Sequence, residues 1–187
     1  YTAASLVAMM LALLALLLSR PEAFALQTID GRAVEPFAGP QRATVFVFVR
    51  PQCPVSSRYA PELNRLYDEY ASRNIRMWLV YPGREDDEAS VRAHHEEYRL
   101  RVPALRDPEF ELTDLAAASM TPEAAVFLAD GRMIYRGRID DRAVRLGVWQ
   151  PAARARDLAR VLDRIARDER VSPFTTQAVG CYIKPVS

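Results

Sequence analysis

The sequence is poor in cysteine, histidine and lysine. Its 187 residues include two cysteines, Cys53 and Cys181, and two histidines, His94 and His95. Lys184 is the only lysine, so arginine supplies nearly all of the positive charge, and the formal net charge is +1. A balanced charge does not indicate a basic surface of the kind that binds nucleic acid or acidic lipids. We therefore expect no nucleic-acid partner.

The shortage of histidine and cysteine also leaves few ligands for a metal or a haem. On a helix, neighbouring side chains point about 100° apart, so His94 and His95 are poorly placed to bind one ion together. We expect both at the surface or rim of the domain, and we expect the acidic run Gly83 to Glu88 to form a solvated face and the first turn of a helix. The sequence contains no Cys-x-x-Cys-His motif. We predict neither a cofactor nor a metal site.

Charge is absent from the first nineteen residues, which are almost all apolar. As a helix they would span about 28 Å, close to the thickness of the hydrocarbon layer. A cleaved signal peptide is the alternative, because Ala23-Phe24-Ala25 resembles a small-x-small cleavage site. We favour a retained anchor, since the residues that follow read as the first strand of a domain. The predicted organisation is an anchor at 1–19 and a linker at 20–24.

Residues 25–169 carry the pattern of one α/β domain. Runs of β-formers at 43–49 and 75–82 predict buried strands, and the amphipathic helix expected to start at Cys53 lies between them. This order indicates a parallel β-α-β crossover. The Asp30-Gly31 and Asp130-Gly131 pairs each predict a hairpin turn. Further patterns predict helices at 86–100, 110–119 and 151–169 and a short strand at 102–107, whereas the tail, 170–187, which carries Cys181, has no recognisable period.

Cys53 is the strongest candidate for a reactive residue. It stands at the predicted junction of a central strand and a helix, where sites of α/β folds gather. The unpaired N–H groups of a helix N-terminus favour the thiolate, so this thiol is expected to be acidic and nucleophilic. Pro51 and Pro54 flank the cysteine and indicate a turn, not a position in the core.

Several motifs together resemble the thioredoxin-like superfamily. The motifs are a hydrophobic strand followed by "PQCPVS", a β-α-β unit, and "MTPEAAVFLADGRMIYRG". The resemblance covers roughly 24–168 and is closest to the membrane-anchored TlpA-like and AhpC/TSA redoxin proteins. It implies a thioredoxin-like fold, with a central mixed sheet flanked by helices. It also implies that Pro122, preceded by Thr121, forms a cis bond and faces Cys53.

The sequence departs from each well-defined branch of that superfamily. Ser56 replaces the second cysteine of Cys-x-x-Cys, so no resolving cysteine lies nearby. Arg50 and Phe46 stand where peroxiredoxins carry a hydroxyl residue and a proline, which removes the signature of peroxidase chemistry. Ser57 takes the place of the second cysteine of Sco-type copper chaperones, so copper would lack a soft ligand.

Cys181 is the remaining candidate partner for Cys53. An extended tail of about eleven residues reaches ~36 Å, enough to cross a small domain. A disulfide requires Cα atoms within about 7 Å, which the sequence does not establish. A permanent bond, a cycling bond and no bond all remain open at this point.

Two functions from different classes follow. In the first, the protein is a periplasmic thiol redoxin, held in the bacterial inner membrane by one helix. Cys53 attacks a protein disulfide or oxidised thiol, Pro122 shapes the docking groove, and Cys181 resolves the mixed disulfide. In the second, the fold is catalytically degenerate and serves as an accessory subunit of a larger membrane complex. A permanent Cys53–Cys181 bond would argue for the second function.

Overall fold

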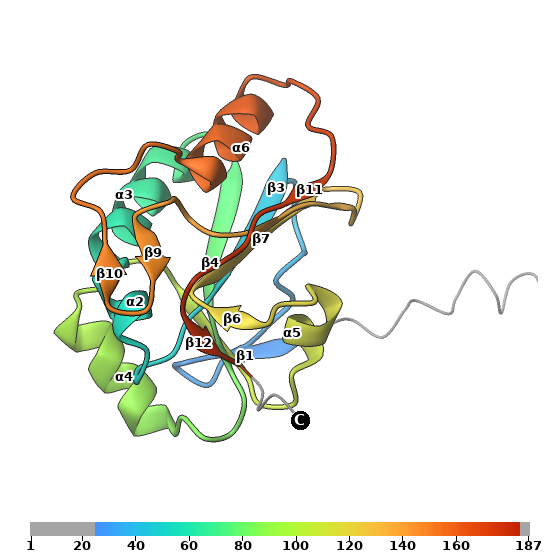
Figure 1. Ribbon diagram of the computed structural model, residues 1–187. Helices are drawn as coiled ribbons and strands as arrows, with labels where there is room; N and C mark the ends of the chain where they lie inside the picture. The colour runs from blue at the N-terminus through green and yellow to red at the C-terminus, as the bar shows by residue number, and fades with distance from the viewer. Residues whose placement is uncertain (1–24, 184–187) are drawn as a thin grey trace, which may run out of the picture.

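The computed structural model describes residues 25–183, which fold around one eight-stranded mixed sheet (Figure 1). β3 is central, running parallel to β4 and antiparallel to β7. The α/β thioredoxin-like architecture expected from the sequence is therefore confirmed. In order across the sheet, the strands are β11 (Phe174–Thr175), β8 (Met133–Gly137), β7 (Glu123–Leu128), β3 (Ala43–Phe48), β4 (Ile75–Pro82), β5 (Ala104–Asp107), β1 (Leu26–Thr28) and β2 (Ala33–Val34).

Every residue of β3 is buried, because the sheet is covered on both faces. Val45 and Val47 belong to the apolar cluster on one face, together with residues of α3 (Ala60–Ala71), α4 (Glu88–Glu97) and α6 (Asp157–Ala166). Phe46 and Phe48 belong to the cluster on the other face, with residues of α5 (Glu111–Leu115). The alternation of a strand thus explains why a continuous apolar run predicted a central position.

The helix expected to start at Cys53 is broken into two. α2 (Pro54–Arg58) ends before Tyr59, and α3 begins directly after it. The physical cause is Pro61, which has no N–H for the carbonyl group of Ser57 and whose ring crowds that carbonyl. The break directs α3 across the sheet and leaves α2 as a short helix that carries the cysteine at its N-terminus.

Both predicted hairpin turns are present. β1 pairs with β2 and β7 with β8, each in antiparallel register. Gly31 and Gly131 adopt φ angles of 78° and 82°, a conformation that glycine accepts without steric cost. A further small hairpin, not expected from the sequence, joins β9 (Ala143–Arg145) and β10 (Val148–Trp149).

The tail after α6 contains two strands, although its sequence predicts no regular structure. β11 runs parallel to β8 at the edge of the main sheet. β12 (Cys181–Tyr182) pairs antiparallel with β6 (Met120–Thr121) in a separate two-stranded sheet. The red strands in Figure 1 show the tail crossing the domain from one to the other.

The predicted anchor at 1–19 and linker at 20–24 lie outside the described residues. Within 25–183, none of the helices combines the length and apolar character needed to cross a membrane.

Candidate functional site

The site forms where β3 ends and β7 begins. In the antiparallel register of these strands, Phe48 lies opposite Glu123, so the residue before β7, Pro122, is close to the turn that follows β3. Within that turn the Cys53 N–H donates to the Arg50 carbonyl oxygen at 3.1 Å. Cys53 is the N-cap of α2, and Pro54 occupies its first turn.

Cys53 and the segment before Pro122 face one another across this junction. The Thr121–Pro122 peptide bond is cis, as the resemblance implies. In its thiol form Cys53 donates to the carbonyl oxygen of Thr121, with 2.9 Å between sulfur and oxygen. The sulfur therefore lies beside Thr121, the last residue of β6.

Cys53 is nevertheless buried, with 1% of its surface exposed. The expectation of a turn outside the core is wrong in this respect: the turn is present, but the C-terminal tail lies against it. β12 places Cys181 directly opposite Thr121, whose carbonyl oxygen accepts from Cys53, so the two cysteines meet at the same residue. Both cysteines are free thiols. The sequence gives no periodic signal for this contact, because β12 contains only two residues.

The surroundings of the two thiols push their pKa values apart. Burial acts to raise the pKa of Cys53, but hydrogen bonds from Ser56 and Cys181 outweigh it, and the pKa is lowered. Burial and the hydrogen bond to Cys53 raise the pKa of Cys181 to about 11. Cys53 is thus the group that ionises first, while Cys181 keeps its proton.

Arg50 connects this turn to the acidic run after β4. Its Nε atom donates to Asp86 Oδ2 at 3.0 Å, and its guanidinium group lies 3.6 Å from Glu85. Asp86 is 1% exposed, so the expectation that this whole run is solvated is wrong for that residue. Asp87 does cap α4 as expected, accepting from the Ser90 N–H at 2.8 Å. Arg50 stands at the position that carries a hydroxyl residue in peroxiredoxins, and it forms an ion pair with Asp86.

His94 is buried behind α2, and the expectation of a surface or rim position is wrong for it. Its Nδ1 lies 2.8 Å from the Tyr81 hydroxyl group, and its Nε2 lies 3.3 Å from Ser57 Oγ. Burial, followed by the neighbouring His95, lowers the pKa of His94 to about 4. The neutral imidazole links β4 to α2. The sequence feature that could have indicated the burial of His94 is Val91, which lies three residues earlier on the same helical face and is also buried.

Glu123 is a further buried residue that the sequence analysis did not single out. It is 4% exposed, and its Oε2 accepts the N–H groups of Ser119 and Met120 at 2.8 and 3.1 Å. These bonds fix the loop that becomes β6. The sequence feature that could have drawn attention to it is its place directly after the Thr121-Pro122 pair.

The potential metal-binding side chains of the described residues do not form a cluster. Among residues 25–183, no three histidine, cysteine or acidic side chains are grouped so as to hold an ion. Ser57, which stands at the copper chaperone's second cysteine position, bonds to His94 instead.

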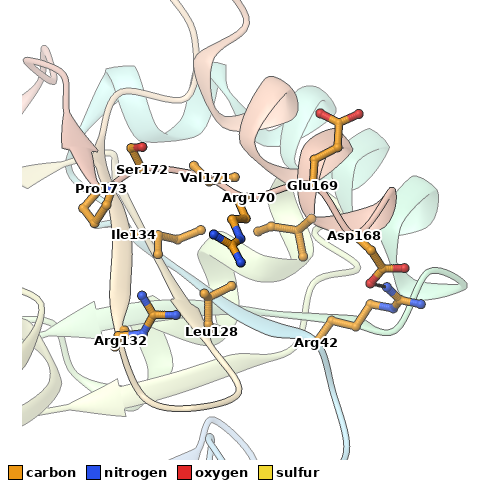
Figure 2. A pocket seen from close by; sticks show the side chains of 11 residues that line it. Arg42, Leu128, Arg132, Ile134, Asp168, Glu169, Arg170, Val171, Ser172 and Pro173 are labelled. Atoms are coloured by element: carbon orange, nitrogen blue, oxygen red, sulfur yellow. Dashed lines mark hydrogen bonds and ion pairs between the residues drawn. The ribbon is translucent and has the colours of Figure 1, made fainter.

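The hollow of about 760 Å³ in Figure 2 lies away from this site. It is lined by Arg42, Arg132 and Arg170 around the apolar side chains of Leu128 and Ile134. Arg42 immediately precedes β3 and Cys53 follows it, so the hollow and the thiols are at opposite ends of that strand. No cysteine or histidine lines it, and the thiol site does not extend into it.

This arrangement of a sheet, a cysteine at a helix N-terminus and a facing cis proline defines a thioredoxin-like protein. Within that class the chain belongs to the AhpC/TSA family, whose model matches residues 20–136. Among curated proteins, none matches the chain.

Solved structures with the same fold cover most of the chain. An uncharacterized conserved protein from Geobacillus kaustophilus is 25% identical, with a TM-score of 0.72 over 88% of this chain and 90% of that one. A hypothetical protein from Sinorhizobium meliloti is 19% identical, with a TM-score of 0.71 over 88% and 91%. A secreted Mycobacterium tuberculosis disulfide oxidoreductase, homologous to E. coli DsbE, is 18% identical, with a TM-score of 0.56 over 78% and 96%.

Proposed function

We propose that this protein is a thiol–disulfide redoxin in which Cys53 is the nucleophile and Cys181 the resolving thiol. The observation that carries the proposal is that both free cysteines lie against the same residue, Thr121, with the pKa of Cys53 lowered and that of Cys181 raised. An acidic nucleophile beside a protonated second thiol is what a two-step exchange requires. The Mycobacterium tuberculosis protein of the same fold, described as a disulfide oxidoreductase, supports this class of chemistry.

In the first step, the Cys53 thiolate attacks one sulfur of a partner disulfide. A bond forms between Cys53 and that sulfur, the partner's S–S bond breaks, and its second sulfur leaves as a thiolate that takes a proton from water. In the second step, Cys181 loses its proton to water and its thiolate attacks Cys53 Sγ. The bond to the partner breaks and the partner's first sulfur leaves as a thiolate, which is then protonated.

The two steps together move two electrons from the protein to its partner. Cys53 and Cys181 end as one disulfide, and the partner's disulfide ends as two thiols. Run backwards, the same steps oxidise a partner dithiol. The substrate in either direction is a protein thiol or disulfide, and no cofactor enters the balance.

Intact-mass measurement of the reduced full chain, after incubation with a disulfide-bonded protein, tests this function. The expected product has lost the mass of two hydrogens and regains it on reduction. Cys181→Ser should stop at a mixed disulfide with the partner, and Cys53→Ser should not react. A wild-type chain that stays reduced under an excess of disulfide would contradict the proposal.

The cellular setting is part of the same proposal. The nineteen uncharged residues at the start of the sequence support an inner-membrane anchor with the domain in the periplasm, where disulfide chemistry operates. Fractionation of bacteria that express the full chain should place it in the carbonate-resistant membrane fraction. Protease added to spheroplasts should digest the domain. Recovery in the soluble fraction, or protection in intact spheroplasts, would contradict the anchor or its orientation.

The 1% exposure of Cys53 favours a second candidate, an accessory subunit of a membrane complex that no longer uses its thiol. The Cys53→Ser variant separates the two functions. A subunit that acts only as a scaffold should complement a deletion strain equally well with serine at this position, whereas a redoxin should not.

A further inference from the structure

The C-terminal tail is bound at the thiol site as a short β-strand. In the pair formed by β12 and β6, Cys181 lies opposite Thr121 and Tyr182 opposite Met120. The Ile183 N–H donates to the Ser119 carbonyl oxygen at 3.0 Å. The backbone of the tail therefore forms hydrogen bonds with the segment that precedes the cis proline.

The side chains of this segment differ in how closely the site surrounds them. Gly180 is buried, and a Cβ atom there would lie 1.8 Å from the Thr121 carbonyl oxygen, so only glycine fits. Ile183 is 2% exposed and belongs to the apolar cluster that includes Leu112 of α5. Tyr182, by contrast, is 62% exposed. The site therefore restricts which side chains fit at the positions of Gly180 and Ile183, and it leaves the position of Tyr182 unrestricted.

The strand pairing of β12 is short, and the buried side chain of Ile183 is its main apolar contact, whereas the tail upstream of it is bound by further hydrogen bonds. β12 and β6 each have two residues and form a sheet separate from the main one, and so short a pair adds little stability. Thr176 is held more strongly: its N–H donates to the Arg136 carbonyl oxygen at 3.0 Å, and its Oγ1 lies 2.7 Å from the Tyr135 hydroxyl oxygen. Gly180–Ile183 can thus leave β6 while the chain stays tethered at Thr176.

We propose that Gly180–Ile183 occupies the binding site of the redox partner, and that this partner is an extended peptide with a glycine, a cysteine, any residue and an aliphatic residue in that order. The inference rests on the proposed thiol exchange and adds the recognition rule for its substrate. The peptide pairs with β6 by backbone hydrogen bonds, as strands added to a sheet edge do.

Partner and tail bind this edge in turn. When the peptide occupies β6, its sulfur is bonded to Cys53 and β12 is released. Once the backbone of the peptide leaves β6 with its sulfur still bonded to Cys53, β12 returns and the Cys181 thiolate attacks Cys53 Sγ. The new disulfide forms, and the peptide leaves as a thiolate that takes a proton from water. The tether at Thr176 keeps Cys181 at a high effective concentration, so the return step needs no second molecule.

Short peptides with an activated cysteine test this recognition on the full chain carrying Cys181→Ser. The first peptide has the sequence of residues 178–183, and its cysteine is joined to 5-thio-2-nitrobenzoate through a disulfide bond. The second has valine in place of glycine, and the third has serine in place of isoleucine. Release of the coloured thiol gives the rate, each rate is divided by that peptide's rate with glutathione, and mass spectrometry locates the adduct on Cys53.

The glycine–isoleucine peptide should react about tenfold faster than either control, because a clash or a lost apolar contact costs at least that much in binding. In the protein, Gly180→Val should release β12 and accelerate the reaction of the first peptide several-fold. Equal normalised rates for the three peptides, or a Gly180→Val variant that reacts no faster, would overturn the recognition rule but leave Cys53 as a nucleophile. The absence of a Cys53 adduct with every peptide would overturn the thiol-exchange function itself.

Discussion

Cys181, on the C-terminal tail, lies opposite Thr121, the residue whose carbonyl oxygen accepts from Cys53 at the start of α2. Interaction with the Cys181 side chain is one of the causes that lower the pKa of Cys53. Cys181→Ala removes the donor and should raise the pKa of Cys53, whereas Cys181→Ser keeps a donor and should leave it low. Thiolate absorbance near 240 nm, followed against pH, measures both without requiring access to the buried sulfur. An unchanged titration in the alanine variant would show that the tail does not tune the thiol.

Ser56 occupies the position that would complete a Cys-x-x-Cys motif, and interaction with its side chain is one of the causes that lower the pKa of Cys53. Ser56→Cys should therefore supply a second resolving thiol. In the Cys181→Ser background it should release the trapped mixed disulfide and restore turnover with a protein disulfide, because an intramolecular attack replaces the missing one. A mixed disulfide that persists in the double variant would show that the geometry at position 56 does not allow resolution.

His94 should make the fold sensitive to acid. Its pKa is about 4 in the folded chain, compared with about 6.5 for a free imidazole, so the unfolded chain binds more protons between these values. Stability is therefore lost as the pH falls from about 6.5 towards 4, by on the order of 3 kcal/mol. His94→Gln cannot titrate and should show a smaller loss. Urea unfolding at pH 7 and near pH 4.5 gives the difference, and equal losses in both proteins would contradict it.

Glu123 holds the loop on which β12 rests. Glu123→Ala leaves the N–H groups of Ser119 and Met120 without their acceptor and should lower the free energy of unfolding by about 1–2 kcal/mol. Because β6 is loosened, alkylation of Cys53 should become faster at constant pH. Glu123→Gln keeps one acceptor oxygen and serves as the matched control. Alkylation rates that match the wild type in the alanine variant would mean that β6 does not depend on this carboxylate.

Local patterns predicted those parts of the fold that local chemistry determines. The apolar run of β3 and the glycine turns at Gly31 and Gly131 are specified by neighbouring residues, and the strands and hairpins are present where they were expected. The cis bond before Pro122 was implied by family resemblance. The break at Tyr59 was missed although Pro61 is visible in the sequence, because the apolar spacing continues across it.

Features that depend on distant packing were not predictable in this way. β12 has two residues, too few for a period, and its partner β6 is about sixty positions earlier in the chain. The burial of Cys53 follows from that pairing and not from the turn around it. His94 is buried because α4 presents it to Tyr81 and Ser57, and these contacts come from three separate elements.

The position of β12 also gives the protein a natural place for an optical label. The described part of the chain ends at Ile183, one residue after this strand, and the next residue, Lys184, is the only lysine in the sequence. An amine-reactive dye therefore has a single side-chain target, directly beyond the strand at the thiol site. Changes in the anisotropy of that dye would report each departure and return of the strand in real time, without the introduction of a third cysteine.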